Sequence, residues 1–161
     1  MTQINNPVAL ESKRRLVTAL LALMEEKSYF KINIQELATR AGMDRRTFYR
    51  NFDSKEDVLR RYMNIFLKRF VMSLKVESEL NIDNTIEILI NSLDEYKTFL
   101  VLLNKSGIVF FLLEYLNQNL NLIMEIIKER SPYSLEANFE DKLAYSIGGT
   151  YNFLVRNLMI S

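Results

Sequence analysis

The sequence contains no cysteine and no histidine among its 161 residues. Their absence excludes disulfides, thiolate zinc sites, cysteine nucleophiles and imidazole bases together. With only four glycines and two prolines, the chain also has little turn chemistry for β-hairpins. We therefore expect an all-helical fold with no metal site and no cofactor. Because no convincing pair of nucleophile and base is left, we expect that the protein is not an enzyme.

Long apolar runs are missing as well. The longest run without a charged residue, 143–155, has 13 residues, whereas a membrane-spanning helix needs about 20 apolar residues. The first ten residues do not show a basic start followed by an apolar stretch, which is the pattern of a secretory signal. We expect no membrane partner.

The net charge of +1 hides an uneven distribution of charge. Residues 1–76 carry 15 Lys and Arg against 8 Asp and Glu, a net charge of +7, and residues 77–161 carry 6 against 12, a net charge of −6. This asymmetry favours a first half that meets a polyanion and a second half with a different task.

Helical spacing of apolar residues extends along most of the chain. Capping patterns predict where several helices begin: Asn33 with Glu36, Asp44, Ser54 with Asp57, and Asn84 with Glu87. The expected helices are 7–26, 33–41, 45–52, 55–76, a stretch from 84 to 105 that is interrupted near 95–98, 108–130 and 135–160.

Residues 33–56 combine a short helix, a turn at Gly42 and a second short helix. Such an arrangement places the start of the second helix where it can enter a DNA major groove. Phe48 and Phe52 lie four residues apart and should pack inward, so that the basic residues face outward. Arginine can pair with guanine, and hydroxyl groups suit phosphate oxygens. The predicted DNA-binding residues are Arg45, Arg46, Thr47, Tyr49, Arg50, Asn51, Lys55 and Asn33.

Residues 16–59 resemble the DNA-binding domain of TetR/AcrR-type transcriptional regulators. The pattern A-x-x-A-G-M-D-R-R-T-F-Y-R-N-F-x-S-K-E-D-V-L, which starts at Ala38, carries the resemblance. The chain departs from the commoner family pattern at Arg46, where a small residue is frequent, and at Asn51, where histidine is frequent. The resemblance implies a homodimeric regulator of the bacterial cytosol, most often a repressor, that binds a palindromic operator in double-stranded DNA.

The resemblance also implies the domain organisation. We expect a three-helix helix-turn-helix domain at 1–53, joined by a long helix to a helical domain at 54–161 for dimerisation and effector binding. An alternative hypothesis is an interaction module or co-activator whose C-terminal half docks a partner protein, with DNA binding secondary.

The C-terminal half contains more apolar surface than one protomer core requires. The last predicted helix has a packing seam that includes two adjacent glycines, and we favour a dimer interface there over the wall of a pocket. The residues of this predicted interface are Ile147, Gly148, Gly149, Tyr151, Leu154 and Leu158. A small-molecule effector is left open, and the polar and aromatic residues that would line its pocket are Tyr96, Phe99, Tyr115, Asn119, Tyr145 and Asn152.

Overall fold

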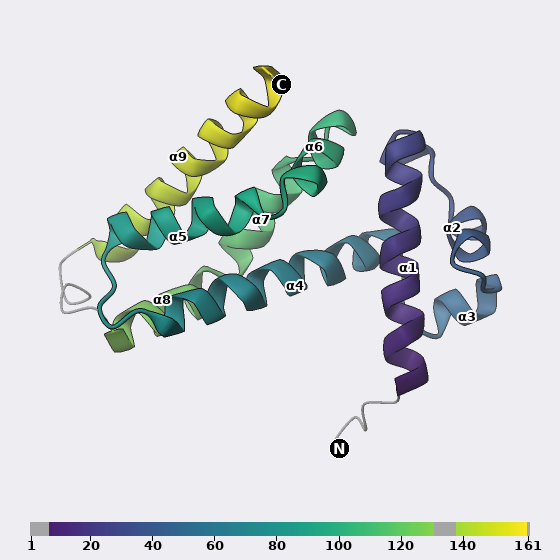
Figure 1. Ribbon diagram of the computed structural model, residues 1–161, viewed down its shortest axis with the longest axis horizontal. Helices are drawn as coiled ribbons and strands as arrows, with labels where there is room; N and C mark the ends of the chain where they lie inside the picture. Colours follow the sequence, from purple (N-terminus) through teal and green to yellow (C-terminus); the bar gives the residue numbers. More distant parts are fainter. Residues whose placement is uncertain (1–6, 131–137, 161) are drawn as a thin grey trace. The chain divides into compact units, whose positions relative to one another are not determined.

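The computed structural model describes residues 7–130 and 138–160, with side chains up to residue 157 (Figure 1). The expected all-helical fold is confirmed, because no strand occurs in these two segments. The chain divides into two compact units, Met1–Tyr62 and Met63–Ser161, and the division falls inside one continuous helix, α4 (Lys55–Val76).

The first unit consists of α1 (Pro7–Glu26), a 3-10 turn (Tyr29–Lys31), α2 (Ile34–Arg40), α3 (Arg45–Tyr49) and the start of α4. In the ribbon, α2 lies against α1 and α3 (Figure 1). Apolar side chains from all of these elements form the core. Its fully buried members are Leu16, Leu20, Leu23, Met24, Tyr29, Leu37, Ala38, Phe48, Val58 and Leu59.

Side-chain caps start the helices of this unit where the sequence predicts them. The Asn33 side chain accepts a hydrogen bond from the Glu36 N–H at 2.9 Å, and the Asp44 carboxylate accepts one from the Thr47 N–H at 2.6 Å. Only half of the predicted capping box at Asn33 forms, because the Glu36 carboxylate instead pairs with Lys27 at 2.5 Å.

Helix α4 begins with a complete capping box. The Asp57 N–H donates to the Ser54 hydroxyl at 3.2 Å, and the Ser54 N–H donates to the Asp57 carboxylate at 3.1 Å. The predicted range of this helix, 55–76, is confirmed.

Helix α3 ends at Tyr49, earlier than the predicted end at Phe52. Local side-chain bonding accounts for the difference, because the Asn51 amide donates to the Thr47 carbonyl at 2.8 Å and closes the last turn.

The second unit contains the rest of α4 and five further helices. These are α5 (Ile82–Asp94), α6 (Lys97–Lys105), α7 (Phe110–Gln118), α8 (Leu120–Arg130) and α9 (Phe139–Ile160). Helix α9 packs against α5, α6 and α7. Taken singly, no helix in the described segments is long and apolar enough to cross a membrane; α6 and α7 meet that test only as a pair, which is bent by 118°.

Two expectations for this unit are wrong. Helix α5 begins after Asn81, not at Asn84, because Asn81 and Asn84 form a capping box of two asparagines, with bonds of 2.9 and 2.8 Å. The predicted helix 108–130 is two helices that meet at Asn119. There the Asn119 side-chain amide donates to the Tyr115 carbonyl at 2.8 Å and interrupts the regular backbone hydrogen bonding of the helix. The predicted start of the last helix, 135–137, lies outside the described residues.

Candidate nucleic-acid interface

Helix α3 presents a basic outer face. The side chains of Arg45, Arg46, Tyr49 and Arg50 are exposed, whereas Phe48 is fully buried. Phe48 anchors the helix because its ring lies 6.3 Å from that of Phe52 and edge-on to that of Tyr49 at 5.4 Å. The inward and outward faces are therefore those that the sequence predicts.

Arg45 and Tyr49 form a pair on this face. The Arg45 guanidinium donates to the Tyr49 hydroxyl at 3.3 Å and lies 5.5 Å from the centre of the ring. A cation over an aromatic ring one helical turn away restrains both side chains. A ligand at this face would therefore meet the two groups in a partly fixed arrangement.

Three further predicted residues border the other side of α3. Thr47, Arg50 and Asn51 line a hollow of about 150 Å³, together with Val8, Ala9 and Ser12 from the first turns of α1. Hydrogen bonds from the backbone N–H and the side chain of Thr47, in the first turn of α3, hold the pKa of the Asp44 carboxyl below its usual value. Asp44 therefore caps α3 in its charged form near neutral pH.

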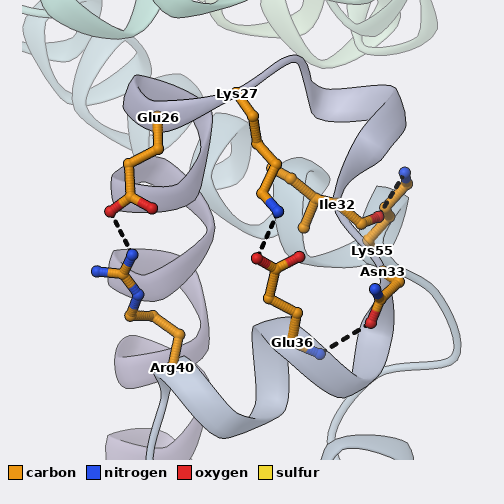
Figure 2. Close-up of polar contacts among 7 residues, drawn as sticks. All are labelled: Glu26, Lys27, Ile32, Asn33, Glu36, Arg40 and Lys55. Carbon is orange, nitrogen blue, oxygen red and sulfur yellow. Dashed lines mark hydrogen bonds and ion pairs between the residues drawn. The ribbon is translucent and has the colours of Figure 1, made fainter.

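Lys55 and Asn33 lie side by side at the starts of α4 and α2 (Figure 2). The Lys55 ammonium donates to the carbonyls of Tyr29 at 2.9 Å and Ile32 at 3.0 Å, and it lies 4.4 Å from the centre of the Tyr29 ring. Two of its three donors are therefore used to hold the segment that leads into α2.

The other half of this arrangement was not predicted from the sequence. The Tyr29 hydroxyl donates to the Glu56 carboxylate at 2.8 Å, and burial, helped by this carboxylate, raises the pKa of Tyr29. Tyr29 is thus held at its carbonyl by Lys55 and at its hydroxyl by Glu56. An aromatic residue in a short connector was the available signal.

Within the described residues, the ion pairs of the first unit do not involve the arginines in and directly after α3. The first unit carries 12 Lys and Arg against 8 Asp and Glu, a net charge of +4. Some of its carboxylates pair with cations outside α3, as in Lys27–Glu36 and Arg40–Glu26 (Figure 2). Over the described segments, Arg45, Arg46 and Arg50 form no ion pair. Their charge is therefore available to an anionic ligand.

The six predicted effector residues do not meet in one cavity. Tyr96, Phe99 and Tyr115 are buried, and the Tyr115 hydroxyl donates to Asn64 at 2.8 Å. Asn119 is half-buried and bonded to the backbone. Tyr145 and Asn152 are exposed on α9, where Tyr145 is 84% exposed.

A hollow in the second unit lies elsewhere, among α5, α6 and α9. Its volume is about 280 Å³, and its lining combines apolar side chains with an acid, a lysine and two asparagines. The lining residues are Ile90, Asn91, Leu93, Asp94, Lys97, Leu100, Phe153, Leu154 and Asn157. Nothing in the sequence pattern separates these residues from ordinary helix-packing positions.

The residues of the predicted dimer interface differ in burial. Ile147 is buried within the unit, Gly148, Tyr151 and Leu154 are half-buried, and Gly149 is exposed. The side chain of Leu158 lies outside the described residues. The outer face of α9 also carries two exposed aromatic side chains, Tyr145 and Phe153, four residues before and four residues after Gly149.

Comparison with protein families finds a match within the first unit. Residues 16–62 match the family described as "Bacterial regulatory proteins, tetR family". The matched segment contains α2, the turn at Gly42, α3 and the start of α4. Neither the curated proteins nor the solved structures contain a significant match to the chain.

Proposed function

We propose that this chain, a DNA-binding transcription regulator of the tetR family, represses transcription in the bacterial cytosol as a homodimer on a palindromic operator. The observation that carries this proposal is the outer face of α3, with Arg45, Arg46 and Arg50 exposed and unpaired in the described structure. In the proposed complex, α3 of each protomer lies in a major groove, and the two grooves are successive.

The side chains divide into two roles. Arg45 and Arg46 lie at the start of α3 and would reach the base edges, where a guanidinium can pair with the O6 and N7 atoms of guanine. Phosphate contacts fix position rather than sequence. We assign phosphate contacts to Asn33, Thr47, Tyr49, Arg50, Asn51 and Lys55.

We place the dimer interface on α9, around the residues predicted from sequence: Ile147, Gly148, Gly149, Tyr151, Leu154 and Leu158. Support comes from the exposed Tyr145 and Phe153, because large exposed apolar side chains beside a glycine suit close packing of a second helix. Ile147 would act from within the protomer, as a support for this face.

A small-molecule effector that releases the operator is also part of the proposal. The hollow among α5, α6 and α9 supports it better than the six residues predicted from sequence, because its apolar walls and few polar groups match the usual lining of ligand sites.

The test is selection of bound duplexes from random and genomic DNA with the full chain, followed by titration of salt. With roughly four to six phosphate contacts per protomer, the logarithm of affinity should fall with the logarithm of salt concentration with a slope of about −0.9 per contact. Arg46→Ala should relax the selected sequence. Lys75→Ala, in the exposed last turn of α4, is the matched control and should not.

Two outcomes would overturn the proposal. Binding without steep salt dependence would contradict the proposed phosphate contacts. If Arg46→Ala and Arg45→Ala both left the selected sequence unchanged, the proposed base contacts would be wrong. Failure to enrich any duplex, together with tight capture of one protein encoded beside it, would favour the alternative function as a protein interaction module.

A further inference from the structure

Three arginines border a second hollow in the first unit. It has a volume of about 240 Å³ and lies between α1 and the end of α2. Its charged residues are Arg14, Arg15 and Arg40, and Thr18 adds a hydroxyl group. Small apolar residues complete the lining, namely Ala19, Ala22 and Ala41. None of these residues belongs to the proposed DNA-binding set.

Arg15 is seated over the turn between α2 and α3. A Cβ atom added to Gly42 would collide with the Arg15 guanidinium, so the glycine makes room for it. This guanidinium therefore lies beside the C-terminal end of α2, where the helix dipole favours a cation.

The other two arginines of the lining are each paired with a carboxylate. The Arg14 guanidinium donates two hydrogen bonds to the Glu11 carboxylate, at 2.8 and 2.7 Å. Arg40 pairs with Glu26, as Figure 2 shows. Arg15 forms no ion pair within the described segments, so one of the three guanidinium groups that line the hollow has no carboxylate partner there.

We propose that this hollow binds a small phosphate-bearing molecule. A guanidinium presents parallel N–H donors that match two phosphate oxygens, and one phosphate can bond to more than one such group. Arg15 would be the principal contact, with Arg14 and Arg40 as flanking contacts, and the alanines would receive an apolar part of the ligand. The volume of about 240 Å³ is several times the roughly 30 Å³ share of one water in the liquid.

The charges at the edges favour a small anion over a nucleic acid. Glu11 and Glu26 are bonded to the flanking arginines and would repel an extended row of phosphates. A compact anion can sit between them on Arg15. Because the Arg15 guanidinium lies beside Gly42 and Arg40 is the last residue of α2, a ligand that bonds to both would stabilise the turn that positions α3.

Inorganic pyrophosphate is the probe, titrated into the full chain by calorimetry against sodium chloride at matched ionic strength. We expect saturable binding that weakens at least tenfold with Arg15→Gln. Arg15→Lys should weaken it less, because lysine keeps the positive charge but lacks the parallel N–H donors of the guanidinium. Ala22→Leu should also weaken binding, because it fills the hollow without a change of charge. Lys75→Gln removes one charge from the other unit and should leave binding unchanged.

Loss of binding with Lys75→Gln equal to that with Arg15→Gln, or the absence of saturation above the chloride control, would overturn the proposal. Thermal unfolding checks that each variant is folded. The salt dependence of DNA binding is the second readout. Arg15→Gln should leave its slope unchanged, and a slope shallower by about 0.9 would assign the hollow to a DNA phosphate instead. Because calorimetry is done without DNA, its result is independent of the proposed operator binding.

Discussion

The two adjacent glycines of α9 lead to the sharpest prediction about stability. Gly148 and Gly149 lie in the interior of a 22-residue helix, and neither has a positive φ. A Cβ atom added at either position meets no atom within 4 Å outside the local helix. Within one protomer, nothing therefore requires glycine at these two positions, and alanine should stabilise the helix.

The expected gain is about 1 kcal/mol for Gly148→Ala and the same for Gly149→Ala, because alanine loses less backbone freedom on folding. In a protein of this size, each would raise the melting temperature by roughly 2–4 °C. Gly42→Ala and Gly107→Ala are the matched controls. Both glycines have a positive φ, 68° and 69°, so alanine should cost about 1–2 kcal/mol, with a further cost at Gly42 from the collision with Arg15.

Urea unfolding followed by far-UV circular dichroism measures these changes, and it must be repeated over a range of protein concentrations. If a second copy packs closely on α9, Gly149→Ala will weaken association while it stabilises the protomer. Its gain in the free energy of unfolding over the wild type will therefore be largest at low protein concentration. A lower urea midpoint for Gly148→Ala at every concentration would refute the reasoning, because it would mean that glycine is required inside the protomer.

Three further predictions concern the first unit. Tyr29→Phe removes the 2.8 Å hydrogen bond to Glu56 and should lower the free energy of unfolding by about 1–2 kcal/mol in urea titrations; no change would mean that the bond is dispensable. Phe48→Ala empties a fully buried site and should cost about 3–5 kcal/mol, measured in the same way, whereas a cost below 1 would contradict the role of Phe48 as an anchor. The pKa of Asp44 is lowered in the folded state, so its contribution is present above the unfolded value near 4 and is lost as the pH falls through the folded value. Unfolding measured from pH 6 to pH 2 should therefore show a steeper acid loss for the wild type than for Asp44→Asn, and parallel curves would contradict this assignment.

Local signals in the first unit allowed good prediction of its helices. Asn33, Asp44 and Ser54 are short polar residues that accept hydrogen bonds from backbone N–H groups three positions on, and this preference acts without help from distant residues. Gly42 has the positive φ of 68° that the turn after α2 requires.

The second unit was harder to predict because asparagines compete there for the same backbone groups. At the start of α5, both Asn81 and Asn84 match a cap, and the asparagine side chain at Asn84 completes a box that a search for Glu or Gln overlooks. Asn119 ends one helix and precedes the next, although the apolar pattern runs through it without a break.

Side-chain sites depend on contacts between distant residues, which the sequence pattern does not contain. The outward face of α3 follows from the four-residue spacing of Phe48 and Phe52 alone. By contrast, the hydrogen bonds of Lys55 to the Tyr29 and Ile32 carbonyls join residues 26 and 23 positions apart, so no local pattern predicts them. The predicted effector residues were chosen by type, and type does not determine burial: Tyr115 is buried and Tyr145 is exposed.

The hydrogen bonds of Lys55 and Glu56 to Tyr29 differ in how far they depend on the residue type at position 29. Lys55 bonds to main-chain carbonyls, which any residue at position 29 supplies, and its further contact is with the ring of Tyr29, not with the hydroxyl. Glu56 bonds to a phenolic hydroxyl, which phenylalanine or leucine would remove. In an alignment of relatives, residue 56 should therefore covary with the hydroxyl at residue 29, whereas residue 55 depends only on an aromatic ring there, which phenylalanine also supplies.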